Sequence, residues 1–195
     1  PADRIPADSA LEEQLAGVSL APKLPDDPRY DAVRQFWQKH EHKKLADYLD
    51  KMLAQEKLGE EMRTVLTTQR EELNKRIERQ GARVQTLGQG PDYTAASNAL
   101  EKLARDWKGL APADAAEKEL DRFGKDPAIK KELAAGRALE KLLAAHDTTK
   151  LAQARKLVDE LVKFRKRYEG TNAATRASEL QTQLGDRLRG EFARE

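Results

Sequence analysis

Two histidines close together, His40 and His42, are the side chains with the clearest potential for chemistry. Imidazole is a common zinc ligand, but a protein zinc site needs three or four placed ligands. Residues two positions apart do not share a helix face, so these rings could converge only in a turn. The third histidine, His146, is distant in the sequence, and the chain has no cysteine. His40 and His42 are therefore weak metal candidates, and we expect a solvated turn that holds no metal or other cofactor.

A basic run at residues 163–168 has a composition that is common in nucleic-acid binding surfaces, because two aromatic residues are interleaved with four cations. However, Phe164 and Tyr168 fall on the apolar stripe of a predicted helix, which leaves the cations on its solvated side. Cations near a helix C-terminus also interact favourably with the helix dipole. In the whole chain, 36 basic and 34 acidic residues are interspersed. These features argue against a nucleic-acid partner.

Carboxylates and serines are plentiful, but none of them stands in a pattern that is typical of a catalyst. No Asp or Glu lies in an apolar stretch that would tune its pKa for acid–base catalysis. The serines lack the glycine-flanked context of a nucleophile elbow. Residues 88–91, Gly-Gln-Gly-Pro, lack the lysine and the preceding strand of a phosphate-binding loop. The sequence therefore predicts a protein that is not an enzyme.

The composition predicts an all-α protein. Charged residues make up 36% of the 195 residues, and aromatic residues only 5%. Alanine, leucine, glutamate, lysine, arginine and glutamine dominate, and these are strong helix formers. No alternating run rich in Val, Ile or Thr indicates a strand. The low apolar content is typical of an elongated helical array, in which each helix buries one stripe and exposes the rest. No apolar run approaches the length of a membrane-spanning helix.

Proline and glycine divide the chain into three parts. Five prolines among residues 1–28 predict an N-terminal arm. We interpret this arm as a poorly ordered terminus, and the alternative is that Leu11 and Leu15 pack on the protein's own helices or on a neighbour. Residues 29–88 form an N-terminal helical region. Residues 89–195 form a second helical region, which begins after the glycine-rich linker.

Local signals place several helix boundaries. An acidic residue followed by proline predicts helix starts at Asp27–Pro28 and at Asp126–Pro127. A turn near residues 39–43 is favoured between two apolar stripes at helical spacing, and one long helix is the alternative because no Pro or Gly separates the stripes. Further turns are expected at residues 109–112 and 146–149. These boundaries predict short helices that alternate in direction along most of the chain.

One helix, at about residues 60–87, is predicted to be much longer than the others. Its 28 residues would span about 42 Å. Few apolar residues serve this length, so the helix should expose much of its surface or pair in a coiled coil. Leu66, Leu73 and Ile77 lie near one stripe of this helix. Together with Leu11 and Leu15 of the arm, they are the candidate partner-binding residues.

An internal repeat relates two turns in the C-terminal region. Trp107 and Gly109 align with Tyr168 and Gly170 at a constant offset of 61 residues. In each copy an apolar helix runs into an aromatic residue, then a glycine turn, then a second helix that opens with small residues. Such self-similarity is the signature of helical repeat architectures. The residues that carry the repeat are Trp107, Gly109, Tyr168, Gly170, Thr171, Ala174 and Ala177.

The pattern aromatic-x-Gly-Thr-x-Ala-Ala at these residues resembles tetratricopeptide-like (TPR-like) helical repeats of bacterial cell-envelope proteins. The resemblance covers about residues 92–188 and implies an array of antiparallel helical hairpins, a TPR-like solenoid, that presents a surface to another protein. It also favours a periplasmic or secreted location, with the cytoplasm as the alternative. A helix at residues 127–146 separates the two matching hairpins and interrupts a regular groove. Residues 1–88 resemble no family in this way.

The sequence as a whole predicts a non-enzymatic helical scaffold or adaptor, whose partner is another protein or a second copy of the chain. Two alternatives come from other classes. One is an accessory module of an envelope thioredoxin-like or other enzyme system, which gene context would reveal. The other is a polyanion or nucleic-acid binder that uses the basic run, for which salt-dependent retention on heparin is the test. No cofactor and no membrane span are expected.

Overall fold

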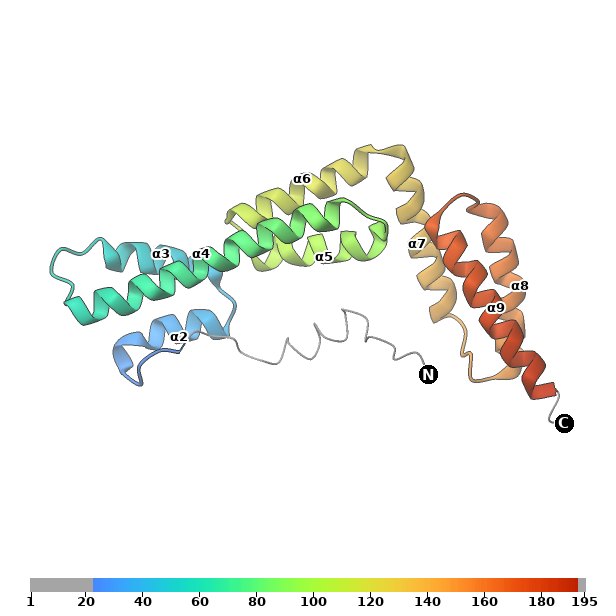
Figure 1. Cartoon of the computed structure of the whole chain (residues 1–195), viewed down its shortest axis with the longest axis horizontal. Helices are drawn as coiled ribbons and strands as arrows, with labels where there is room; N and C mark the ends of the chain where they lie inside the picture. The colour runs from blue at the N-terminus through green and yellow to red at the C-terminus, as the bar shows by residue number, and fades with distance from the viewer. Residues whose placement is uncertain (1–22, 193–195) are drawn as a thin grey trace. The chain divides into compact units, whose positions relative to one another are not determined.

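The structure, a computed structural model, describes residues 23–192 and places them in helices and the segments between them. No strand occurs among these residues, which confirms the predicted all-α class. Leu11 and Leu15 of the N-terminal arm lie outside the described residues. Figure 1 shows the helices in chain order. They are the 3₁₀-helix η1 (Pro28–Tyr30) and the α-helices α2 (Asp31–Gln38), α3 (His42–Leu53), α4 (Glu60–Gly88), α5 (Tyr93–Asp106), α6 (Ala111–Lys125), α7 (Pro127–Ala144), α8 (Leu151–Arg167) and α9 (Asn172–Phe192).

Two acidic residues start helices as the sequence predicts, each followed by a proline. The Asp27 side chain accepts a hydrogen bond of 2.8 Å from a backbone N–H of η1. Asp126 Oδ1 accepts hydrogen bonds from the backbone N–H groups of Ala128 and Ile129 at 2.8 and 3.2 Å. These N–H groups have no partner within the helix, so each cap stabilises its helix by about 1 kcal/mol.

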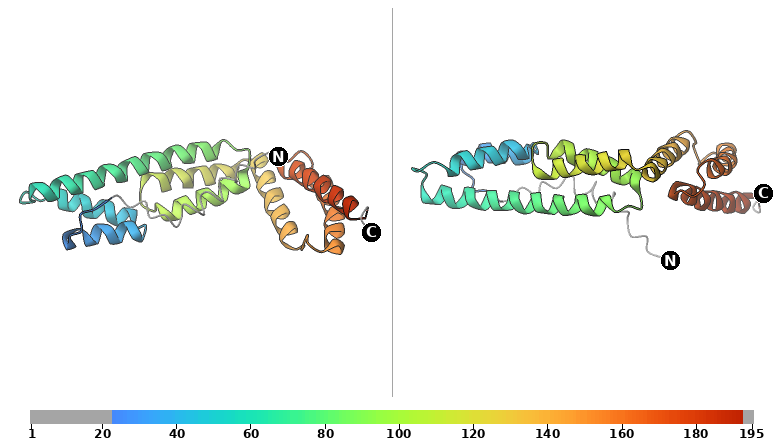
Figure 2. Two further views of the ribbon diagram at one scale, coloured as in Figure 1. Left: turned by 60° about the horizontal axis from the view of Figure 1, so that its bottom comes forward. Right: turned by 90° about the horizontal axis from the view of Figure 1, so that it is seen from above.

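The chain folds into two compact units. Among the described residues, the first comprises residues 23–79 together with Asp106–Leu110, and the second comprises Gln80–Arg105 and residues 111–192. The boundary therefore falls within α4, and not in the glycine-rich linker that separates the predicted helical regions. Helix α4 is uninterrupted from Glu60 to Gly88, as Figures 1 and 2 show, and its residues are divided between the two units.

The core of the first unit is formed by α2, α3 and the first part of α4. The indole N–H of Trp37 on α2 donates a hydrogen bond of 2.9 Å to Gln69 Oε1 on α4. A turn at residues 39–41, in which His40 has φ +54°, joins α2 to α3 and confirms the predicted turn. The buried residues of η1 and of these three helices include Tyr30, Val33, Trp37, Leu45, Ala46, Leu49, Leu66, Gln69 and Leu73.

Helix α4 is the long helix that the sequence predicts, and it runs over 29 residues. Its apolar stripe, however, is not an exposed contact surface. Leu66 and Leu73 are 2% and 0% exposed, and Ile77 is half-buried. Helices α2 and α3 contact this part of α4, for example through the ion pair of 2.7 Å between Asp50 and Arg70. The role of Leu66 and Leu73 is therefore in the core of the first unit, and this corrects their interpretation as exposed partner-binding residues.

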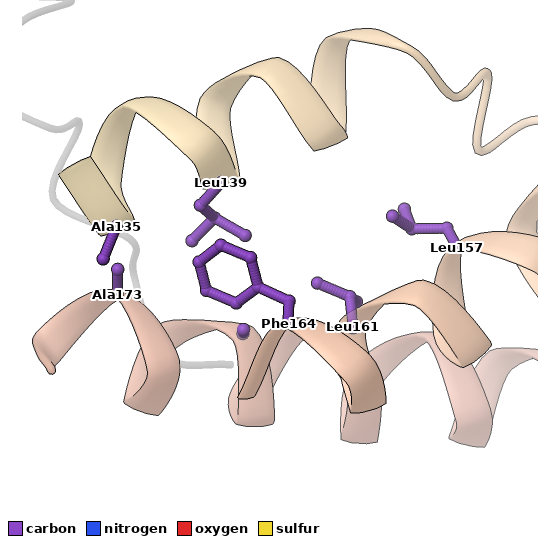
Figure 3. Packing of buried hydrophobic residues seen from close by; sticks show 7 residues of the cluster. Ala135, Leu139, Leu157, Leu161, Phe164 and Ala173 are labelled. Carbon is purple, nitrogen blue, oxygen red and sulfur yellow. The ribbon is translucent and has the colours of Figure 1, made fainter. Parts of the chain in front are cut away.

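In the second unit, α8 and α9 lie side by side and pack with α7 (Figure 1). Figure 3 shows the Phe164 ring on α8 pointing toward Leu139 on α7, while Ala135 and Ala173 face each other where α7 meets α9. The small alanine side chains allow the helix backbones to approach closely. Full burial of each larger side chain stabilises the unit by about 1.5–3 kcal/mol. The buried cluster consists of Ala135, Leu139, Leu157, Leu161, Phe164, Ala173 and Ala177.

Two turns, 61 residues apart in the sequence, share one backbone geometry. Gly109 and Gly170 both have φ +79°. This left-handed conformation costs a residue with a Cβ atom about 1–2 kcal/mol, so glycine is the favoured residue. In each turn a backbone N–H donates to the carbonyl oxygen of the aromatic residue three positions earlier, at 3.0 Å for Trp107 and 3.2 Å for Tyr168. The sequence repeat is thus also a repeat of backbone conformation.

Helices α5 and α7 come into close contact at Gly136. A Cβ atom at this position would lie 1.8 Å from Thr94 Oγ1 and 2.9 Å from Thr94 Cβ. Both separations are far shorter than the optimal contact of about 3.5–4.0 Å between carbon atoms. The missing side chain of Gly136 therefore sets how closely the start of α5 approaches the middle of α7.

Candidate functional site

A groove of about 420 Å³ lies in the second unit, between the start of α5, the middle of α7 and the first turns of α9. Its volume falls within the range of ligand pockets, about 300–1,000 Å³. We name it the α5–α7–α9 groove. Its apolar lining is formed by Tyr93, Leu139, Leu143 and Ala173, and its charged lining by Asp92, Glu132, Glu140, Arg176 and Glu179.

Asn172, the first residue of α9, connects the three segments that form the groove. Its side-chain amide donates a hydrogen bond of 3.1 Å to the Pro91 carbonyl oxygen, just before α5. Its backbone N–H donates to the Glu132 carboxylate on α7, with both oxygens at 3.0 Å. The Asp92 side chain accepts a hydrogen bond of 2.9 Å from the Ala95 backbone N–H. Two of the groove's four carboxylates are thus engaged at helix N-termini, where negative charge is favourable.

Thr94 brings a buried polar group to the groove. The residue is 7% exposed, and its hydroxyl forms no hydrogen bond with another residue of the described chain. Leaving a buried polar group without a partner costs about 1–3 kcal/mol. Within residues 23–192, the one fully enclosed side-chain atom without a partner is Tyr30 Oη. The Thr94 oxygen is therefore not sealed in the core, and it is open to the groove that it lines.

The other two carboxylates of the groove have no structural partner. Glu140 on α7 and Glu179 on α9 are exposed, and neither forms an ion pair or hydrogen bond with another described residue. Arg176 is the groove's single basic residue and is likewise without such a contact. The groove is therefore locally acidic, although the chain as a whole has a formal net charge of +2. A cleft lined by one sign of charge attracts ligands of the opposite sign.

The two histidines have different environments. His42 is 6% exposed and stacks on Trp107, with ring centroids 4.0 Å apart and 4° between the ring planes, whereas His40 is exposed. The Nδ1–H of His42 donates to the Asp106 carbonyl oxygen at 3.2 Å, which assigns the tautomer of the neutral ring. The expectation of a solvated turn was therefore wrong for His42, because Trp37 and Trp107 enclose its ring.

Burial lowers the pKa of His42 below its usual value of 6.5, because removal from water disfavours the charged ring. The hydrogen bond to the Asp106 carbonyl opposes this effect, and the nearby His40 and Arg76 reinforce it. The Arg76 guanidinium lies 4.4 Å from the centroid of the Trp37 ring, which in turn contacts the His42 ring edge-on. His42 is consequently neutral at pH 7 and acts as a packing residue between Trp37 and Trp107.

The basic run at residues 163–168 has its aromatic side chains turned inward. Phe164 is 7% exposed, and its ring centroid lies 4.7 Å from that of the half-buried Tyr168. Stacking on a nucleic-acid base needs an accessible ring face, and these rings face the core. The exposed Arg165 and Lys166 border a second hollow of about 540 Å³ at the α8–α9 turn, which Glu169 also lines. This hollow has one more cation than anion and is thus basic, in contrast to the α5–α7–α9 groove.

Three further findings concern the chain as a whole. Among the residues that the structure describes, no three His, Cys, Asp or Glu side chains are grouped so that they could hold a metal ion. Within residues 23–192, every helix is too short or too polar to cross a bilayer. No protein-family model, curated protein or solved structure matches the chain.

Sequence patterns located the repeat turns but not the groove. One available signal was Gly136, which stands on the apolar stripe of its helix, three residues before Leu139. A glycine inside a helix lowers its stability, so a glycine at a stripe position indicates a close approach by a neighbour. Glu140 and Glu179 carried no comparable signal. Exposed glutamates also occur on α4, α5 and α6, and these two come together only through the packing of α7 on α9.

Proposed function

We propose that the chain is a non-enzymatic helical scaffold that binds a segment of another protein in the α5–α7–α9 groove. The observation that carries this proposal is the groove itself, which combines an apolar lining, the Thr94 hydroxyl without a partner, and the unpaired Glu140 and Glu179. Peptide-binding clefts characteristically combine apolar pockets with a few placed polar groups. Each of these groups has an unused interaction that a bound segment would satisfy.

The proposal includes a TPR-like arrangement of helical hairpins. Its support is the shared geometry of the two turns at Gly109 and Gly170, both with φ +79°, and the close packing of α8 on α9. Helix α7 stands between the two hairpins in the sequence and supplies Leu139, Leu143 and Glu140 to the groove. The binding site would thus lie where an extra helix interrupts the repeat.

Site-specific photocrosslinking tests the proposal. A photoreactive phenylalanine is placed at Arg176, an exposed groove residue, and in a matched variant at Glu117, an exposed residue of α6 that does not line the groove. Both variants are irradiated in extract of the source cells. We expect a discrete crosslinked protein from the Arg176 variant and none of it from the Glu117 variant. Addition of Glu140→Trp, which fills the groove from α7, should remove the product.

Two results would contradict the proposal. Identical products from the two positions, or products that persist when Glu140→Trp is present, would show that the groove is not the contact. A product composed only of this chain would identify a second copy as the occupant and would replace the adaptor proposal with self-assembly.

A further inference from the structure

The charges of the groove point to one class of partner. We infer that the α5–α7–α9 groove accepts a polypeptide segment that carries a lysine or arginine next to an apolar side chain; this inference rests on the proposed function. The segment would place its apolar side chain against Leu139 and Leu143 and its cation beside Glu140 and Glu179. Its backbone would supply a hydrogen-bond partner for Thr94.

Charge complementarity is the first support. Four carboxylates and one guanidinium line the groove. Because Asp92 and Glu132 already bond to helix N–H groups, Glu140 and Glu179 are the two whose charge is not used within the described chain. A neutral or acidic segment would leave them unpaired. A cationic segment would gain both contacts without breaking an existing ion pair.

Thr94 is the second and independent support. The residue is 7% exposed and lines the groove, and its hydroxyl has no partner among the described residues. A hydroxyl donates one hydrogen bond and accepts two, so it can bond either to a carbonyl or to an N–H of a bound backbone. A free amine or metal ion would satisfy the carboxylates but would leave the apolar lining without a contact, which is why a polypeptide segment fits better than a small cation.

Defined peptides test this inference. The probe is a fluorescein-labelled short peptide that contains two Leu–Lys pairs between glycines, and the comparison peptides replace either lysine by glutamate or leucine by serine. Fluorescence anisotropy at low salt should show saturable binding of the Leu–Lys peptide alone. Binding should weaken as salt rises, because dissolved ions screen the attraction between solvent-exposed charges.

Matched variants place the binding in the groove. Glu140→Gln with Glu179→Gln should weaken the Leu–Lys peptide about tenfold, since each exposed ion pair contributes a few-fold. The control, Glu117→Gln with Asp159→Asn, removes the same charge from exposed positions of α6 and α8 outside the groove and should change Kd by less than about twofold. Glu140→Lys with Glu179→Lys should transfer the preference to the Leu–Glu peptide.

Equal weakening by the two double variants, or equal binding of all three peptides, would overturn the inference. Binding of the Ser–Lys peptide as tight as that of the Leu–Lys peptide would overturn its apolar part. If photocrosslinking at Arg176 still captures a partner after Glu140→Gln and Glu179→Gln, the scaffold proposal stands and the cationic partner is wrong. If the Arg176 variant captures no partner while Glu140 and Glu179 are unchanged, the scaffold proposal itself is refuted.

Discussion

Substitution of Gly136 by alanine tests how α5 and α7 are held together at the groove. Taken alone, alanine in the middle of a helix is more favourable than glycine by about 1 kcal/mol. At this position, however, the new Cβ would lie 1.8 Å from Thr94 Oγ1 and 2.9 Å from Thr94 Cβ. Rotation of the threonine side chain can move the oxygen away, but it cannot move the Cβ atom. The two helices must therefore separate.

Such overpacking costs about 1–3 kcal/mol. After the gain in helix propensity of about 1 kcal/mol, Gly136→Ala should destabilise the protein by about 1 kcal/mol. The control is Gly185→Ala on α9, because nothing lies within 4 Å of a Cβ atom at that position. Gly185→Ala should stabilise the protein by about 0.5–1 kcal/mol. The two variants should thus differ in free energy of unfolding by about 2 kcal/mol, roughly a thirtyfold difference in the unfolding equilibrium.

The assay is urea unfolding followed by circular dichroism. The dependence of the unfolding free energy on urea concentration is compared first, because the variants can be compared in stability only if this slope is unchanged. The double variant Thr94→Ala with Gly136→Ala completes a mutant cycle, in which the removal of Oγ1 and Cγ2 ends the 1.8 Å clash and leaves only the 2.9 Å approach of the Cβ atom of residue 94. We expect a favourable coupling energy of about 1 kcal/mol between the two sites. If Gly136→Ala is as stable as Gly185→Ala, or if the cycle shows no coupling, the close contact of α5 with α7 is refuted.

Three further predictions concern the rest of the fold. The lowered pKa of His42 means that the unfolded chain takes up a proton at this ring more readily than the folded chain. The contribution of His42 to stability should therefore be constant above pH 6.5 and should fall as the pH decreases from 6.5 toward the folded pKa. Urea unfolding followed by tryptophan fluorescence should show this loss of stability, and His42→Phe should flatten it. Gly170→Ala should lower the free energy of unfolding by about 1–2 kcal/mol because of its φ of +79°, and Gly170→Asn by less, as measured by thermal and urea unfolding. Asp126→Ala should lower the free energy of unfolding by about 1 kcal/mol through loss of the cap of α7. The control Asp159→Ala, at an exposed position of α8, should change it by less than about 0.5 kcal/mol. An equal effect of the two substitutions would argue against capping.

Much of the fold follows from local sequence signals, because those signals act over a few residues. The caps at Asp27 and Asp126, the turn at residues 39–41 and the glycine turns all depend on backbone groups within about four positions. The length of α4 follows in the same way, from the absence of a break. These features need no knowledge of tertiary contacts.

The roles of individual side chains could not be predicted so well, because they depend on which helices pack together. Leu73 was interpreted as an exposed contact, since its stripe is sparse, but it is fully buried in the unit in which α2 and α3 contact α4. His42 was expected in solvent, but Trp107 comes from a segment more than sixty residues away and stacks on its ring. The groove has the same origin, because Thr94, Glu140 and Glu179 lie on three different helices.

The central claim is that the α5–α7–α9 groove binds a cationic, partly apolar segment of another protein. Its most direct test is an NMR titration of the isotope-labelled chain with the Leu–Lys peptide. Saturable shifts should be concentrated at the backbone amides of Thr94, Gly136, Glu140 and Arg176, and the amides around Lys166 in the basic hollow should not move. Shifts spread over exposed acidic residues throughout the chain, or concentrated at Lys166, would contradict the claim.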